Sequence, residues 1–147
     1  MKKDRQKDGG PLQRFGVSME GKLLDLFDRM IAKRGYRNRS EAIRDLVRDK
    51  LVEEEWAAGS REVVGTLTII YDHHTRELQA RMTELQHTYH ALVISTLHVH
   101  LDHDNCLEVL VVRGRPRDIR VLSDGLLSLK GVKHGRLAAT TSGKMLS

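Results

Sequence analysis

The sequence is poor in cysteine, in aromatic residues and in long apolar runs. One cysteine among 147 residues excludes a disulfide within the chain, agrees with a reducing compartment and leaves the thiol available to a metal. Aromatic residues make up 4% of the chain, so the core must consist mainly of leucine, valine and isoleucine. No apolar run reaches transmembrane length, and residues 1–8 lack the apolar segment of a signal peptide. We therefore expect a cytoplasmic protein with no membrane partner.

The remaining composition is that of a soluble, folded protein with an uneven charge. Hydrophobic residues make up 39% and charged residues 31%, and the length suits one ordinary domain or two small ones. Residues 1–50 carry 14 Lys/Arg against 8 Asp/Glu, whereas residues 51–147 carry 11 against 12. A basic N-terminal third is typical of a nucleic-acid-binding segment, although a solvated pair of basic helices would carry the same charge.

The first third of the chain predicts one strand and two helices after a flexible basic arm over residues 1–12. Residues 14–19 alternate between apolar and other side chains, which indicates a strand with one buried face. An apolar stripe of helical period then runs from Glu20 to Gly35, where a glycine ends the helix. Ser40 is a suitable N-cap for a second helix.

The second helix should end near Trp56, and residues 57–60 read as a linker. One strand and two helices bury too little surface to be stable alone, so we expect an intertwined dimer in which two copies of the strand pair as a ribbon. Such a ribbon fits the DNA major groove. Its outward residues Arg14, Gly16 and Ser18 are the predicted DNA contacts.

Residues 91–101 and 107–113 predict a β-hairpin that carries two histidines and the cysteine. Because strand side chains alternate, His98 and His100 should project from the same side, and Cys106 should return close to His100. Imidazole and thiolate are ligands that nickel, copper and zinc prefer. A hydrogen-bonded surface or core histidine is the ordinary alternative, and a Cys/His nucleophile is the enzymatic one, for which no orienting partner is recognisable.

The C-terminal two thirds predict six elements in the order βαββαβ, a ferredoxin-like arrangement. They are a strand over 62–71, a helix over 75–87, the two hairpin strands, a helix opened by Pro116 and a strand over 131–140.

Two stretches make the chain similar to the nickel-responsive regulator family, NikR. Residues 35–45 read Gly-Tyr-Arg-Asn-Arg-Ser-Glu-Ala-Ile-Arg-Asp, and residues 86–108 combine Gln-His-x-x-His with the hairpin motif. The resemblance covers residues 13 to about 140. It implies an α+β fold, with a ribbon-helix-helix DNA-binding domain over 13–58 and an ACT-like domain over 61–141 that binds metal and forms a homotetramer.

The resemblance also implies the ligands of one Ni²⁺ per subunit. By motif they are His98, His100, Cys106 and a neighbouring subunit's copy of His87. The preference for nickel over copper or zinc rests on the resemblance, because three imidazoles and a thiolate suit all three ions.

Two acidic residues, Glu41 and Asp45, match a weaker cation site of the family, although solvated helix acids have the same sequence appearance. Glu108 could accept a hydrogen bond from a ligand N–H, or it could be an ordinary surface carboxylate. The remaining histidines are expected in solvent or turns: His73, His74, His103 and His134.

These features predict a nickel-dependent repressor that binds palindromic operator DNA. One alternative is a ribbon-helix-helix regulator that senses another metal or an amino acid, with the histidines incidental. Another is a metal-storage protein or metallochaperone whose basic arm serves solubility. An enzyme is the least favoured class, because no nucleophile–base pair or phosphate loop is present.

Overall fold

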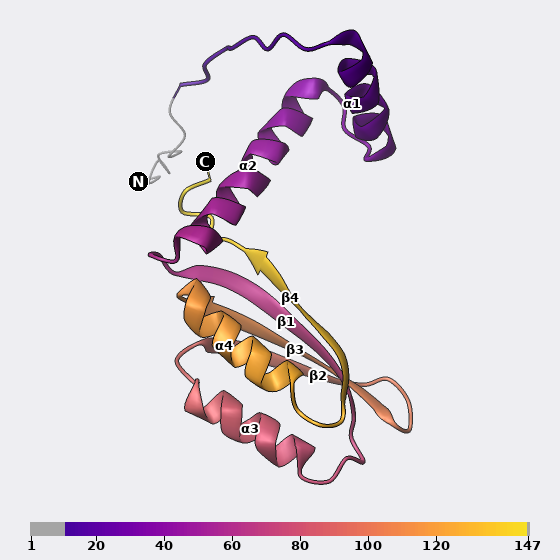
Figure 1. Ribbon diagram of the computed structural model, residues 1–147, viewed down its shortest axis with the longest axis vertical. Coiled ribbons are helices and arrows are strands. Elements are labelled where there is room, and N and C mark those ends of the chain that lie inside the picture. The colour runs from indigo at the N-terminus through magenta and orange to yellow at the C-terminus, as the bar shows by residue number, and fades with distance from the viewer. Residues whose placement is uncertain (1–10, 147) are drawn as a thin grey trace, which may run out of the picture. The chain divides into compact units, whose positions relative to one another are not determined.

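The computed structural model describes residues 11–146, in which four helices and four strands follow one another as shown in Figure 1. The helices are α1 (Gly21–Lys33), α2 (Arg39–Ala58), α3 (Leu78–Thr88) and α4 (Pro116–Leu127), and the strands are β1 (Val63–Asp72), β2 (Val93–His100), β3 (Asn105–Gly114) and β4 (Val132–Thr140). They form two compact units, residues 11–50 with 143–146 and residues 51–142, which are described separately. Among the described residues, no helix has both the length and the apolar character needed to cross a membrane.

The N-terminal unit contains α1 and the first part of α2, joined by a tight turn. Gly35 adopts φ +76°, and the N–H groups of Gly35 and Tyr36 donate to the carbonyls of Ala32 and Ile31, which ends α1 as predicted. The Asn38 side chain accepts a hydrogen bond from the Glu41 N–H at 2.9 Å. Asn38 is therefore the N-cap of α2, and the prediction of Ser40 was wrong.

Residues 11–20 form no strand in the described chain, so the strand predicted over 14–19 is not present within one copy. A strand is defined by hydrogen bonds to a neighbouring strand, and the predicted neighbour here is a second copy of the same segment. Most of the basic arm predicted over residues 1–12 lies outside the described residues, and the described Pro11 and Leu12 are exposed.

Apolar side chains of the N-terminal unit are largely uncovered. Phe15 is 75% exposed, and Val17, Leu23, Leu26, Leu46 and Val47 are exposed as well. In this unit only Ile31 and Ala42 are buried hydrophobic residues. So many exposed apolar side chains in one small unit favour an interaction surface, which agrees with the expectation that the unit is completed by a second copy.

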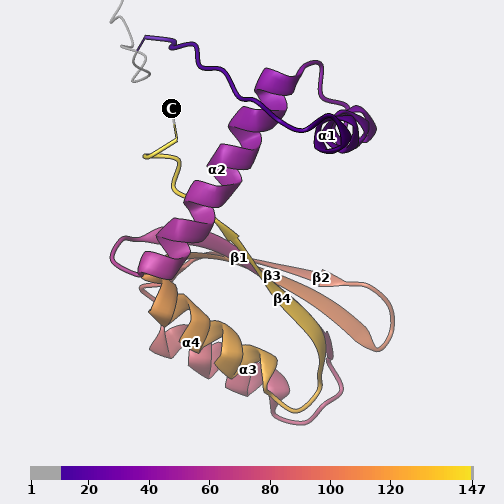
Figure 2. The same cartoon turned by 45° about the horizontal axis from the view of Figure 1, so that its top comes forward.

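The C-terminal unit has the predicted βαββαβ order. Its four antiparallel strands are arranged β2-β3-β1-β4, with β3 and β1 in the centre. Helices α3 and α4 lie together on one face of this sheet (Figures 1 and 2). This is the ferredoxin-like topology, and the predicted α+β fold class is confirmed.

The core of this unit lies between the sheet and the two helices. Alternate residues of β1 and β3 are buried, as expected for strands with one covered face. The buried hydrophobic side chains include Leu67, Ile69, Tyr71, Leu110, Met82, Ile119, Leu122 and Leu126. Pro116 occupies the first helical position of α4, as predicted.

Helix α3 begins three residues later than predicted, at Leu78 instead of Thr75. The preceding residues form a turn in which the Asp72 side chain accepts a hydrogen bond from the His74 N–H and the Asp72 carbonyl accepts one from the Thr75 N–H. Glu77, just before the helix, adopts the left-handed φ of 66°. Apolar periodicity alone does not reveal a turn held by such side-chain bonds.

Gly135 in β4 provides a test of how closely the sheet packs. A methyl group at this position would overlap the Leu127 side chain and lie 2.8 Å from the Thr68 carbonyl oxygen. We expect Gly135→Ala to lower the free energy of unfolding by about 1–3 kcal/mol, measured by denaturant titration of the full chain. Gly125→Ala in α4 is the control, because its methyl group would meet only Leu85 at ordinary contact distance. Equal stability of the two variants would contradict the described packing.

Candidate metal centre

The β2–β3 hairpin determines which side chains meet at the candidate metal centre. In its register His100 lies opposite Cys106, and His98 lies opposite Glu108. The connecting turn is held by Asp102, whose Oδ1 accepts hydrogen bonds from the backbone N–H groups of Asp104 and Asn105 at 2.9 and 2.8 Å. The Asn105 side-chain amide, together with these backbone bonds, lowers the pKa of the Asp102 carboxyl. The predicted hairpin and its polar turn are confirmed.

Cys106 is fully buried, and two histidine nitrogens approach its sulfur. His100 Nδ1 lies 3.3 Å and His73 Nδ1 lies 3.6 Å from Cys106 Sγ. These three ligand atoms all lie within 4.8 Å of one another, which is close enough for one ion to bridge them. From the sequence, His73 was expected in solvent or a turn. The structure brings it to the cysteine because Tyr71 of β1 pairs with Cys106 of β3 across the sheet.

His98 stands beside this group on the same side of β2. The ring centroids of His98 and His100 are 4.9 Å apart, which confirms that the two histidines project together. His98 Nδ1 lies 3.2 Å from the Tyr71 hydroxyl and 3.7 Å from Glu108 Oε2. A ring whose Nδ1 faces these groups leaves Nε2 as the nitrogen available to a metal.

Glu108 is a buried carboxylate, with 7% of the residue exposed, and it is not a surface residue. Its Oε1 accepts a hydrogen bond from Gln86 Nε2 at 2.6 Å, and its Oε2 accepts one from the Tyr71 hydroxyl at 3.5 Å. Burial raises the pKa of Tyr71, so its hydroxyl remains a donor at neutral pH. Glu108 thus holds a negative charge close to His98, where it can orient the imidazole.

The Cys106 thiol is held in its protonated form by its surroundings. Burial raises its pKa, and the nearby carboxylates of Asp102 and Glu108 raise it further. A cation must therefore displace the thiol proton to bind, and in return its charge offsets both carboxylates. Imidazole nitrogens with one thiolate form a donor set that fits divalent nickel, copper or zinc.

His87 lies away from this group, in the last turn of α3. It is exposed and borders a shallow hollow together with Thr83, Gln86, His90 and Val93. Within residues 11–146 of a single copy, His87 is in neither of the His/Cys/acid groups close enough to hold one ion. Its side chain faces outward, where a second copy could meet it.

A second group of donors lies on the surface beside the first. His74, His103 and Asp104 place three ligand atoms within 4.8 Å, and all three residues are exposed. His73 and His74 link the two groups, because their ring centroids are 4.0 Å apart. This second cluster was not predictable from the sequence, because its members come from two turns that only the folded sheet brings together.

The predicted DNA contacts Arg14, Gly16 and Ser18 are all exposed. Of the two acidic residues proposed for a weaker cation site, Glu41 lies in the first turn of α2. Asp45 already accepts a hydrogen bond from the Tyr36 hydroxyl at 3.1 Å and pairs with Arg48 at 3.0 Å. A cation at Asp45 would therefore share the carboxylate with a neighbouring guanidinium.

Comparison with known families assigns both halves of the chain. Residues 13–54 match the family described as ribbon-helix-helix protein, copG family, and residues 64–140 match the family described as NikR C terminal nickel binding domain. The combination defines a class of transcriptional regulators, and these are not enzymes.

Within that class, the chain belongs to the NikR family of nickel-responsive regulators. It is 60% identical over 132 residues to a protein of Solibacter usitatus named "Putative nickel-responsive regulator", covering 90% of this chain and 95% of that one. Proteins of the same name from Geobacter sulfurreducens and Geobacter sp. are 57% and 56% identical, each covering 93% of this chain and 99% of the other. The family resemblance seen in the sequence is confirmed.

Among solved structures, an uncharacterized protein from Thermotoga maritima shares the fold, with a TM-score of 0.50 and 17% identity. The match covers 55% of this chain and 100% of that protein. At this identity the likeness concerns the fold alone.

The buried carboxylate of Glu108, beside His98, leads to a prediction about nickel affinity. Glu108→Gln keeps the shape but removes the charge that faces His98, so nickel affinity should fall by about 10- to 100-fold, as for other residues that orient metal ligands. Competition with a chelator of known affinity measures the change. Glu62→Gln, which alters an exposed carboxylate paired with Arg113, is the control and should leave affinity unchanged. Affinity within twofold of the unaltered protein would rule out this role for Glu108.

Proposed function

We propose that this protein is a nickel-dependent transcriptional repressor that binds palindromic operator DNA when nickel occupies a site made from two subunits. The observation that carries the proposal is the hairpin pairing of His100 with Cys106, in a chain whose two halves match a DNA-binding family and a nickel-binding family. His98, His100 and Cys106 of one subunit and His87 of its neighbour would hold one Ni²⁺ per subunit. The bound ion supplies a positive charge that joins the two subunits.

Exposed apolar residues support assembly into a homotetramer. On β2 and the following turn, Ile94, Leu97, Val99 and Leu101 are exposed, and Ile94 reaches 59%. This strand lies at the edge of the sheet and also carries His98 and His100. Exposed apolar side chains on an edge strand form a surface that a second copy can cover. The apolar face of the N-terminal unit supports a second, separate dimer contact.

The DNA-binding part of the proposal rests on the N-terminal segment. Paired copies of residues 14–19 would form a two-stranded ribbon in the major groove, with Arg14, Gly16 and Ser18 toward the base edges. Arg14 can donate two hydrogen bonds to a guanine, and Gly16 allows close approach of the backbone. Nickel raises operator affinity only if it binds the DNA-competent arrangement more tightly than the others.

The shared metal site predicts a specific pattern of loss and recovery. His87→Ala and Cys106→Ala should each remove tight nickel binding and nickel-dependent operator binding, because each deletes one ligand of every site. A mixture of the two variants, unfolded and refolded together, should recover a fraction of the sites. Each interface between unlike subunits then contains one site with an intact Cys106 and an intact His87.

Absorption spectroscopy during nickel titration and gel shift on the same samples measure both properties. His134→Ala is the control, because His134 is an exposed histidine of β4 outside the site. Failure of the mixture to recover nickel binding, with both variants folded, would show that the site does not use ligands from two subunits. Nickel binding without operator binding by the unaltered protein would favour metal storage.

Arg14 gives the complementary prediction for DNA. Arg14→Ala should leave nickel affinity and stoichiometry unchanged while weakening binding to the operator by about 1–3 kcal/mol, the usual contribution of a bidentate arginine–guanine contact. Binding to random DNA should change much less. Fluorescence anisotropy with both DNAs, at one fixed salt concentration, separates the two effects. An equal loss on both DNAs would indicate a phosphate contact.

A further inference from the structure

Trp56 is the single tryptophan of the chain, and it lies near the end of α2 with 4% of its surface exposed. It belongs to the same hydrophobic core as the residues of β1, β3 and α4. Val52, one turn earlier on the same face of α2, packs against that core as well. The last two turns of α2 are therefore part of the C-terminal unit, whereas the sequence had placed residues up to 58 in the DNA-binding domain.

Three contacts fix the indole ring within this unit. Its Nε1 donates a hydrogen bond to the Thr140 carbonyl oxygen of β4 at 2.8 Å. The Arg120 guanidinium lies over the ring, 5.7 Å from its centroid. Gly65 of β1 lies beside the ring, since a methyl group there would stand 3.4 Å from the indole, at ordinary contact distance. One side chain thus joins α2 to β1, β4 and α4.

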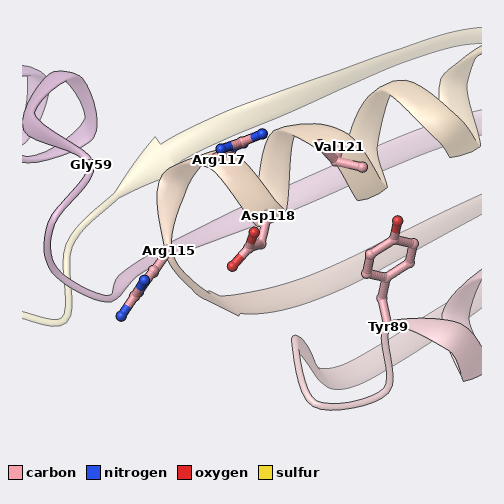
Figure 3. A pocket seen from close by; sticks show the side chains of 6 residues that line it. All are labelled: Gly59, Tyr89, Arg115, Arg117, Asp118 and Val121. Atoms are coloured by element: carbon pink, nitrogen blue, oxygen red, sulfur yellow. The ribbon is translucent and has the colours of Figure 1, made fainter.

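The loop after α2 faces the start of α4 across a hollow. Gly59 and Tyr89 line this hollow together with residues at the start of α4 (Figure 3). Arg115 precedes the helix, and Arg117, Asp118 and Val121 lie in its first turns. The end of α2 is therefore anchored through its own side chain and bordered by the start of α4. Helix α2 itself is continuous from Arg39 to Ala58, across the division between the two compact units.

We propose that Trp56 is the positioning residue that transmits nickel binding from the sheet to the DNA-binding unit, with α2 as the connecting element. The inference rests on the proposed function. Metal ligands and the Trp56 contacts share one sheet, because Cys106 pairs with β1, and β1 and β4 hold the indole. When nickel fixes the sheets of two subunits relative to each other, an anchored helix end is fixed with them. Without this anchor, the end of α2 would be free to reorient relative to the sheet.

The test compares three variants of the full chain. Trp56→Ala removes the anchor, Trp56→Phe keeps a packed ring but loses the N–H bond to Thr140, and insertion of Gly-Ser-Gly after Ser60 lengthens the loop while leaving the anchor intact. For each variant, nickel affinity, tetramer mass and operator affinity with and without nickel are measured. None of the changes touches a proposed metal ligand or DNA contact.

The anchor predicts that all three variants bind nickel within twofold of the unaltered protein. The nickel-induced gain in operator affinity, about 5- to 150-fold for couplings of ordinary size, should fall below about twofold in Trp56→Ala. It should be largely retained in Trp56→Phe and in the insertion variant. A full response in Trp56→Ala, or a response lost only on insertion, would overturn the proposal. Absence of any nickel response in the unaltered protein would instead contradict the proposed function.

Amide hydrogen exchange of the unaltered protein tests the anchor even if Trp56→Ala does not fold. The amides of residues 51–58 should exchange as slowly as those of β1, because their opening requires removal of the indole from the core. Exchange at the rate of an unanchored helix, well ahead of β1, would show that Trp56 does not hold α2 and would overturn the inference.

Discussion

Cross-strand pairing between β2 and β3 places His100 opposite Cys106 and His98 opposite the buried Glu108. The rest of the candidate centre depends on this register, because a shift by one residue would turn both histidines to the opposite face of the sheet. The Asp102 carboxylate holds the turn that fixes the register, through hydrogen bonds that need no metal. The candidate metal centre thus depends on the geometry of the β2–β3 hairpin.

Features encoded locally were predictable from the sequence, and features made by tertiary contact were not. Alternation and periodicity predicted the βαββαβ order, the hairpin and the end of α1 at Gly35. His73 was assigned to a turn, because its approach to Cys106 requires β1 to pair with β3. The same reason explains why burial of Glu108 remained open, since its partner Gln86 comes from α3.

One copy of the chain leaves two apolar surfaces uncovered, one on the N-terminal unit and one along β2. The two surfaces carry different proposed functional residues. Residues 14–19 carry the proposed DNA contacts, whereas β2 carries the proposed metal ligands. A contact on the N-terminal unit would therefore also complete the proposed DNA-binding ribbon, and a contact along β2 would involve the strand that carries two proposed metal ligands. This arrangement explains why the strand predicted over 14–19 has no counterpart within a single chain.

The turn at Asp102 has a kinetic consequence for a metal sensor. Its carboxylate keeps the strands in place whether or not an ion is present, so loss of the ion need not unravel the hairpin. His100 and Cys106 would then stay in position with His98 beside them, and the rate of exchange would depend mainly on how quickly the donor on a separate helix, His87, detaches and returns. A metal sensor built this way would respond to a fall in the concentration of its ion without a refolding step.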